Sequence, residues 1–226
     1  MSKFILLILL GLIGFGCKSQ TKINEDLKKE LDSILVQDQI FREYTDNQTT
    51  DLRKQEISKI VGYPKNYLDN NIWSLITKTD SVNLLKVEKI VLKYGYPGRS
   101  MVGEPTNTAV FLVIQHSPKI SKYYPLIEEA GKNIEIPFTD VAMMLDRKLI
   151  EERKPQIYGT QLEGKSITDE QTGIKRQVIY VLPIEKAKEV NTRRKKAGFE
   201  TTVEENARRF RIEYKQYTYE EIEKMN

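Results

Sequence analysis

The sequence predicts a mainly α protein, a single helical, bundle-like domain with a small β-hairpin near the C-terminal third, and three observations predict it. Apolar residues recur every three or four positions over 23–44 and again over 84–94, which is the period of an amphipathic helix. Residues 106–118 are apolar nearly all round, as in a buried central helix. After Pro155, β-branched and aromatic residues gather in two runs separated by the polar, glycine-ended sequence TDEQTG, which is typical of a hairpin.

The chain begins with an apolar run over 4–15 that follows Lys3 and stops just before Cys17, the only cysteine. This run is too short to span a bilayer permanently, and it has the layout of a secretory signal. Cleavage before Cys17 would make the cysteine the first residue of the mature protein. We therefore predict a signal peptide over 1–16 and a short polar tether over 17–22.

The residues GFGC that end at Cys17 resemble the lipobox of bacterial lipoproteins, although Gly14 stands where leucine is usual. In that family the cysteine sulfur is lipidated, the signal is removed and the new N-terminus is acylated. Two or three chains such as palmitate anchor a protein stably, because each buried CH₂ contributes about 0.8 kcal/mol. The resemblance implies lipidation of Cys17 and attachment to a membrane of the bacterial cell envelope, on its periplasmic or surface face. Lys18 differs from the aspartate that retains some lipoproteins in the inner membrane, which favours the outer membrane.

Composition argues against two classes of function. Lysine and arginine number 36 against 32 acidic residues, so the net charge of +4 gives no large basic field and no nucleic-acid partner is expected. One histidine, with the single cysteine assigned to lipidation, would leave carboxylates alone to complete a metal shell. We therefore expect neither a metal site nor a cofactor.

The predicted domain covers 23–214, and a frayed tail is expected over 215–226. Its first helix runs from 23 to about 44. Asp38 falls on the apolar face of this helix, and Arg42 follows one turn later, so an acid and base pair on the core side is expected.

Over 45–71 the helical period weakens, and the last part, VGYPKNYLDNN at 61–71, is rich in turn formers. The next helix has Asp80 or Ser81 as its cap and ends at Gly95, where a left-handed residue suits glycine. Five further elements are expected, in this order: a buried helix over 106–118, a helix over 119–132, a helix capped by Thr139 and ended by Pro155, a hairpin over about 157–183, and a helix over 185–214 broken by a turn at 197–199.

The loop over 94–105 contains three glycines and two prolines, which specify a shaped connection where a spacer would need neither. Arg99, Ser100 and the amides near Gly103 are candidates for an anion site. The alternative is a rigid connection between helices with Arg99 in a salt bridge.

His116 is the only histidine in the chain, and it lies beside Gln115 on the inner side of the most apolar helix. A buried imidazole needs partners for both ring nitrogens. Two roles are open: a general base that works near physiological pH, or a hydrogen-bonded residue of the core. Asp146 also falls on an apolar helix face and needs a partner if it is buried.

Five short motifs resemble those of a family of uncharacterised bacterial proteins that is classed as a domain of unknown function. The motifs are DQxxR at 38–42, YPGxSxVG at 96–103, QH at 115–116, LDR at 145–147 and PQIYGTQ at 155–161. The resemblance covers roughly 31–214. It implies a mostly helical domain and implies no activity.

The leading hypothesis is a lipid-anchored envelope protein that binds a small molecule or an envelope protein in a polar pocket built from 96–103, His116 and 155–161, since helical domains form pockets where apolar elements meet. The candidate ligand-binding residues are Arg42, Arg99, Ser100, Gln115, Gln156, Tyr158, Thr160 and Gln161. The alternative is a hydrolase acting on an envelope substrate, with His116 as general base and Asp38 or Asp146 orienting it. A third hypothesis is a structural role in which these polar groups form a core network.

Overall fold

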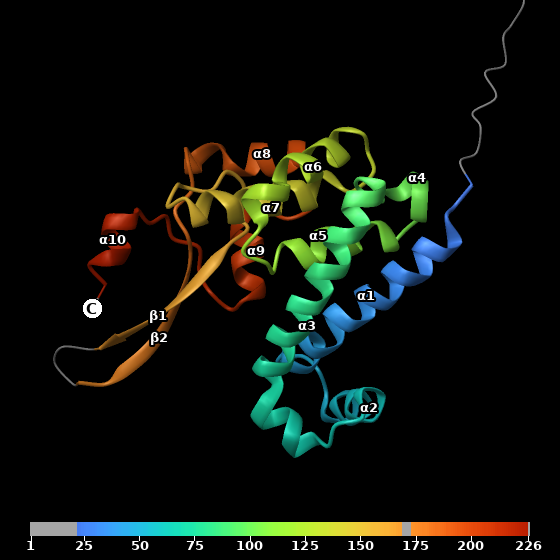
Figure 1. Cartoon of the computed structure of the whole chain (residues 1–226). Coiled ribbons are helices and arrows are strands. Elements are labelled where there is room, and N and C mark those ends of the chain that lie inside the picture. Colours follow the sequence, from blue (N-terminus) through green and yellow to red (C-terminus); the bar gives the residue numbers. More distant parts are fainter. Residues whose placement is uncertain (1–21, 169–172, 226) are drawn as a thin grey trace, which may run out of the picture.

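The computed structural model of the chain describes residues 22–168 and 173–225. Within these residues, helices dominate and the strands form one two-stranded antiparallel sheet, so the predicted mainly α fold with a small hairpin is confirmed (Figure 1). The predicted signal peptide, the lipidation site Cys17 and nearly all of the tether lie outside the described residues. None of the helices over 22–168 and 173–225 has the length and apolarity that a membrane span requires.

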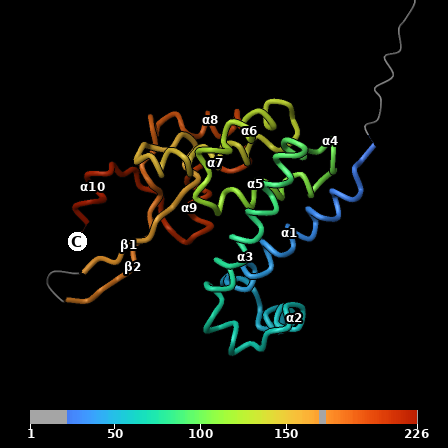
Figure 2. The backbone as a smooth tube through the Cα atoms, in the orientation of Figure 1, coloured from blue at the N-terminus to red at the C-terminus, as the bar shows by residue number. Residues whose placement is uncertain are grey.

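Three helices build one end of the molecule: α1 (Glu25–Thr45), α2 (Asp51–Val61) and α3 (Lys65–Tyr94). The tube through the Cα atoms shows α1 and α3 packed along each other and α2 at the end remote from the start of α1 (Figure 2). Asn24 caps α1 by accepting a hydrogen bond from the amide of Leu27 at 3.1 Å. The predicted first helix is therefore confirmed to within a residue or two at each end.

The segment 61–71, which is rich in turn formers, forms a turn only between α2 and α3, because α3 begins at Lys65; α2 occupies most of the preceding segment, where the helical period weakens. α2 has a single buried residue, Ile57, so its apolar period is weak. Its one clear signal is Thr50, whose side chain accepts from the amide of Arg53. The predicted cap at Asp80 or Ser81 is wrong: both residues lie inside α3.

Four helices follow: α4 (Arg99–Val102), α5 (Ala109–Ile114), α6 (Ile120–Lys132) and α7 (Phe138–Glu151). The buried central helix is present but shorter than predicted, because a 3₁₀ turn precedes α5 and turns follow Ile114. α7 begins after Pro137, so Thr139 lies in its first turn and does not cap it.

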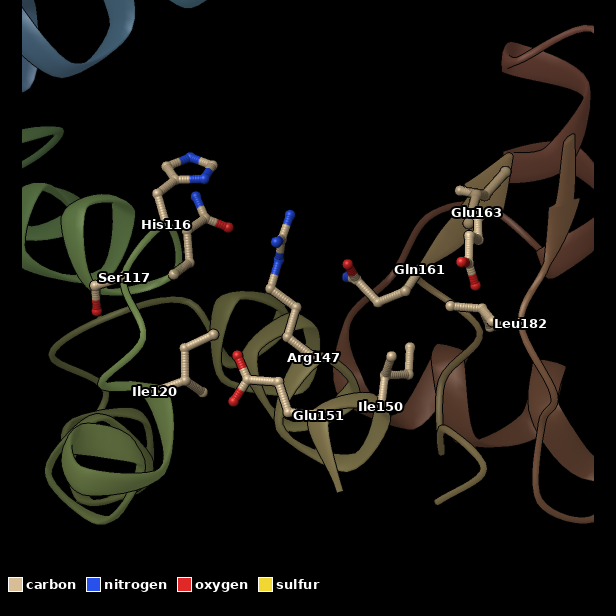
Figure 3. A pocket seen from close by; sticks show the side chains of 11 residues that line it. His116, Ser117, Ile120, Arg147, Ile150, Glu151, Gln161, Glu163 and Leu182 are labelled. Carbon is tan, nitrogen blue, oxygen red and sulfur yellow. The ribbon is translucent and has the colours of Figure 1, made fainter. Parts of the chain in front are cut away.

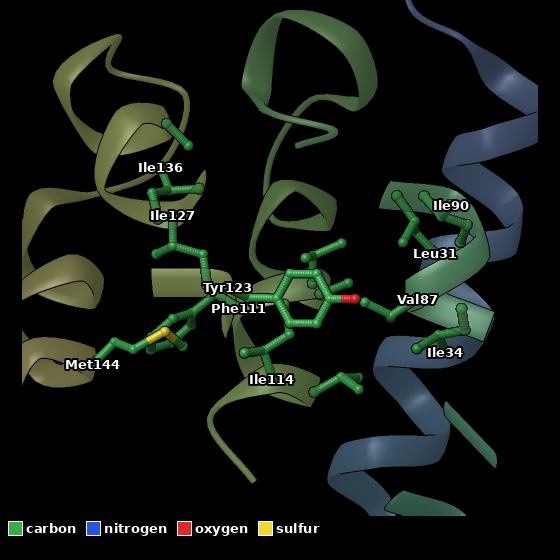
Figure 4. Close-up of a cluster of buried hydrophobic side chains, with 14 of the residues drawn as sticks. Leu31, Ile34, Val87, Ile90, Phe111, Ile114, Tyr123, Ile127, Ile136 and Met144 are labelled. Carbon is green, nitrogen blue, oxygen red and sulfur yellow. The ribbon is translucent and has the colours of Figure 1, made fainter. Parts of the chain in front are cut away.

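The main core surrounds α5, which packs against α1 and α3 on one side and α6 on the other (Figure 4). Burial is nearly complete at the centre of this core. Its labelled members are Leu31, Ile34, Val87, Ile90, Phe111, Ile114, Tyr123, Ile127, Ile136 and Met144. This packing explains why α5 carries almost no polar side chain, and it places the turn after α5 at the edge of the core.

The hairpin consists of β1 (Leu162–Thr168) and β2 (Lys175–Val181), in a register that pairs Leu162 with Val181. The predicted hairpin is confirmed, but its first strand begins several residues later than the sequence indicates. Residues 156–161 form a loop between α7 and β1, which we call the 156–161 loop. The conformation of this loop is fixed by hydrogen bonds to Asp146, Gln156 and Arg194.

The C-terminal region contains α8 (Val190–Ala197), α9 (Val203–Arg209) and α10 (Tyr219–Glu223). The helix predicted over 185–214 is indeed broken, with Gly198 in a left-handed conformation after α8. The expectation of a frayed tail is wrong for α10. Thr218 and Glu221 form a capping box there, and Ile222 packs in a small cluster with Tyr180.

Candidate functional site

A cavity of about 540 Å³ opens between the turn after α5, the C-terminal half of α7 and the start of β1 (Figure 3). We call it the Arg147 cavity. Its polar walls are Gln115, His116, Arg147, Glu151, Gln161 and Glu163. Four of these residues, Gln115, His116, Arg147 and Gln161, come from motifs of the sequence described above, although the motifs are far apart along the chain.

Arg147 enters this cavity from α7, and its side chain lies between His116 and Gln161 (Figure 3). Its Nε atom is buried and has no hydrogen-bond partner, and the guanidinium makes no ion pair with any residue in the described ranges. Burial lowers the pKa of Arg147, while Glu151 acts in the opposite direction. A half-buried guanidinium with unmet donors is suited to donate hydrogen bonds to the oxygens of an anion.

His116 is held neutral by its surroundings. Burial lowers its pKa to about 3, and the positive charges of Arg42 and Arg147 contribute in the same direction. The imidazole makes no hydrogen bond with the part of the chain that the structure describes. A base with so low a pKa binds a proton poorly near neutral pH, so this pKa favours a neutral imidazole that is free to hydrogen-bond a ligand.

The carboxylate of Asp146 is fully occupied by the 156–161 loop. One oxygen, Oδ1, accepts from the amides of Ile157 at 2.7 Å and Tyr158 at 3.0 Å. The other, Oδ2, accepts from the amide of Thr160 at 3.0 Å and from its hydroxyl at 2.9 Å. Burial raises the pKa of Asp146, and these hydrogen bonds oppose the rise. Asp146 therefore anchors the loop, and its hydrogen bonds go to the loop and not to His116.

Gln156 closes the same loop from inside. It is fully buried, and its Nε2 donates to the carbonyl of Leu182 at 2.7 Å while its Oε1 accepts from the amide of Gln161 at 2.9 Å. Gly159 has φ +67°, and a Cβ there would meet Ile184 at 2.6 Å. The PQIYGTQ motif is thus a scaffold that presents the side chain of Gln161 to the Arg147 cavity.

Arg194 of α8 supports the loop from behind. Its guanidinium is almost completely buried and donates to the carbonyls of Tyr158 at 2.9 Å and Thr201 at 2.8 Å. The ring of Tyr158 lies 6.1 Å from that of Phe199. Among the predicted ligand-binding residues, Gln156, Tyr158 and Thr160 therefore contribute to the shape of the loop and do not line the cavity.

Arg42 belongs to an ion-pair cluster with Asp38 and Asp80. Its Nη2 is 2.8 Å from Asp80, and its Nε is 3.7 Å from Asp38, so the predicted pair on the core side of α1 is confirmed. Burial raises the pKa of Asp38 to about 6 although Arg42 lowers it. Asp80 lines a second, smaller cavity of about 250 Å³ that His116 also borders, so this cluster flanks the imidazole on the side of α3.

Arg99 and Ser100 lie away from the Arg147 cavity. The amide and hydroxyl of Ser100 donate to the carboxylate of Glu135 at 2.8 and 2.7 Å, and Arg99 is 3.8 Å from Glu104. A Cβ at Gly98 would overlap the side chain of Glu135, which explains the glycine. The donors proposed for an anion thus already bind a carboxylate of the chain, and this loop is the rigid connection that the sequence analysis kept as its alternative.

Three cavity residues were missed as site candidates: Arg147, Glu151 and Glu163. Arg147 and Glu151 are four residues apart on α7, so a helical-wheel argument could have placed them together on the face beside Asp146. Nothing in the sequence around Glu163 indicates that it reaches a cavity. Over 22–168 and 173–225 there is no group of three or more His, Cys, Asp and Glu side chains that could hold a metal ion.

Every residue that lines the Arg147 cavity lies in a segment, 26–216, that matches the sequence model of a family of unknown function, DUF6624. The chain belongs to this family. It matches no curated protein and no solved structure. The DUF6624 domain thus includes α1 through α9, which means that the cavity, the 156–161 loop and the Arg42 cluster are all parts of that domain.

Proposed function

We propose that this protein is a lipid-anchored component of the bacterial cell envelope whose DUF6624 domain binds a small anionic molecule in the Arg147 cavity. The observation that carries the proposal is the Arg147 guanidinium, which is half-buried, aimed into the cavity and without an ion pair among the described residues. Leaving a charged group partly desolvated and unpaired costs stability. The two oxygens of a ligand carboxylate would accept hydrogen bonds from the guanidinium in the bidentate geometry that arginine favours.

Beside the carboxylates of Glu151 and Glu163, three uncharged side chains of the cavity wall are suited to orient such a ligand. His116, Gln115 and Gln161 are neutral, and each offers hydrogen-bonding groups without adding charge. The Asp146 and Gln156 contacts hold Gln161 in place independently of any ligand. The site is therefore largely formed before binding, which reduces the ordering cost that binding incurs.

Two observations on His116 and Asp146, the residues proposed for hydrolysis, favour binding over hydrolysis. A pKa of about 3 makes His116 a weak base at neutral pH. Asp146 is one of the two carboxylates expected to orient His116. Its oxygens accept hydrogen bonds from the amides and the hydroxyl of the 156–161 loop.

The lipid anchor rests on the apolar run over 4–15 and on Cys17. α1 begins at Glu25, a few residues after that cysteine, so the anchored domain would stand close to the membrane surface. Mass spectrometry of the protein from its native host should find an acylated Cys17 at the N-terminus, and Cys17→Ser should release the protein from the membrane fraction. An intact initiator methionine with an unmodified thiol would contradict the anchor.

Ligand binding is tested by calorimetric titration of the whole protein in nanodiscs, with empty nanodiscs as the blank and sodium hexanoate as the probe at constant ionic strength. We expect saturable binding that Arg147→Met abolishes. Arg99→Gln is the matched control, because Arg99 is exposed and lies outside the cavity. Equal hexanoate binding by the native protein and Arg147→Met would show that the guanidinium is not the anchor.

A further inference from the structure

The Arg147 cavity also contains negative charge, and its two carboxylates differ in their surroundings. Glu151 follows Arg147 by one turn of α7 and raises the pKa of that arginine by direct charge interaction. Glu163 comes from β1, and in the close view it lies beyond Gln161, on the side away from Arg147 (Figure 3). The cavity therefore has a positive group near its middle and a separate negative group at its hairpin end.

Glu163 makes no ion pair with the two cations that line an adjoining cavity with it. This adjoining cavity of about 400 Å³ contains Arg153 and Lys165. Arg153 is bound to Glu223 at 2.8 Å, and the Lys165 ammonium donates to the carbonyl of Ile222 at 2.9 Å. Glu163 makes no ion pair with the residues that the structure describes, so its carboxylate is open to a cation from outside.

The wall near the hairpin end of the cavity is apolar. Ile150 of α7 and Leu182 line both this cavity and the adjoining one, and Leu162 adds to the same wall. Apolar surface of this kind favours the hydrocarbon part of a ligand. A polyanion is disfavoured, because Glu151 and Glu163 would repel its second charge.

We propose that the ligand is a zwitterion whose two charges are several bonds apart, an ω-amino acid or short peptide whose carboxylate binds Arg147, whose ammonium binds Glu163 and whose hydrocarbon portion lies against Ile150 and Leu182. This inference rests on the proposed function, since it names the ligand class of the same cavity. It adds one requirement that simple anion binding lacks: a second charge of opposite sign at the hairpin end.

The test compares three probes of equal chain length in the calorimetric titration: 6-aminohexanoate, hexanoate and hexylamine. We expect 6-aminohexanoate to bind about fivefold more tightly than hexanoate, which is the gain that a partly exposed ion pair gives. Glu163→Gln should remove this gain and leave hexanoate affinity unchanged. Glu30→Gln is the control, since Glu30 is an exposed carboxylate on α1 that does not line the cavity.

The two proposals fail in different ways. If hexanoate binds and depends on Arg147, but 6-aminohexanoate binds no better or Glu163→Gln changes neither affinity, the zwitterion is wrong and the anion site stands. If neither acid binds, the proposed function itself is wrong. A circular dichroism melt of Glu163→Gln shows whether it is folded; should it unfold, Glu163→Asp, which keeps the charge and moves it by one methylene, is expected to keep the preference for 6-aminohexanoate in part.

Discussion

Asp146 and Arg147 are neighbours on α7, and they face opposite environments. The Asp146 carboxylate lies beneath the 156–161 loop, where it accepts hydrogen bonds from three backbone amides and one hydroxyl. The Arg147 guanidinium enters the open cavity with a buried Nε that has no partner. One turn of α7 thus carries both the carboxylate that anchors the 156–161 loop and the guanidinium that enters the cavity.

Arg147→Met should stabilise the fold. The substitution removes a half-buried charge that has no ion pair among the residues of the structure at 22–168 and 173–225, and it keeps a side chain of similar length. The free energy of unfolding should therefore rise by roughly 1 kcal/mol. Urea denaturation monitored by circular dichroism measures it. A loss of stability of that size would mean that the guanidinium has a structural partner and would weaken the case for a ligand.

Arg194→Met is the matched contrast, because Arg194 is also buried but has three hydrogen bonds to Tyr158 and Thr201. Its removal leaves buried carbonyl groups without donors and should lower the free energy of unfolding by about 2 kcal/mol or more. Opposite signs for the two arginines are the expected result.

Asp146→Asn should destabilise the protein by about 3 kcal/mol. The asparagine amide would place its own donors against the amides of the 156–161 loop, where the carboxylate now accepts from all of them. Chemical denaturation at pH 7 measures the change. Asp140→Asn is the control: burial raises the pKa of Asp140 to about 6 with no hydrogen bond opposing it, so its replacement should cost little. Similar losses for both variants would contradict the anchoring role.

Sequence reasoning located the helical class, the hairpin and three cavity residues because those depend on local pattern. The apolar period of α1 placed Asp38 and Arg42 correctly. His116 was predicted on the inner side of the buried central helix, but α5 ends at Ile114 and the histidine lies in the turn that follows. Sequence reasoning failed at α2, where only Ile57 is buried and the periodic signal is correspondingly weak.

The residues that line the cavity were harder to predict, because they depend on which loops pack against one another in the folded protein. Ser100 looked like an anion donor until the structure placed Glu135 against it. Gln156 and Gln161 look equivalent in the motif. Gln156 is buried and hydrogen-bonds the backbone of Leu182, whereas Gln161 lines the cavity. These differences arise from tertiary contacts that no single-sequence spacing encodes.

Gly159→Ala should cost more than a left-handed backbone alone explains. Gly159 and Gly62 both have positive φ, at +67° and +74°, but only at Gly159 would a Cβ meet Ile184 at 2.6 Å. Gly62→Ala should therefore lower the free energy of unfolding by about 1 kcal/mol, and Gly159→Ala by about 3 kcal/mol because of the added steric overlap. Thermal and urea unfolding of the pair measure the difference, and equal losses would argue against tight packing of the loop.

His116→Gln should change how stability depends on pH. Because the folded pKa of His116 is about 3 and its ordinary value is 6.5, the unfolded chain binds a proton between these values that the folded chain does not. Native stability contributed by the neutral imidazole is therefore lost as pH falls below 6.5, by at most about 1.4 kcal/mol per pH unit. Glutamine does not titrate, so the variant should gain relative to the native protein as pH is lowered.

The comparison isolates His116 from the other titrating groups. Burial raises the pKa of both Asp38 and Asp140 to about 6, which acts with the opposite sign between their ordinary value of 3.8 and pH 6. Both residues are present in the native protein and in His116→Gln, so their effects cancel in the difference between the two unfolding free energies measured from pH 7 to 4.5. A difference that does not change with pH would mean that the imidazole keeps its ordinary pKa in the fold, and a general base at this position would then be restored as the better explanation of the site.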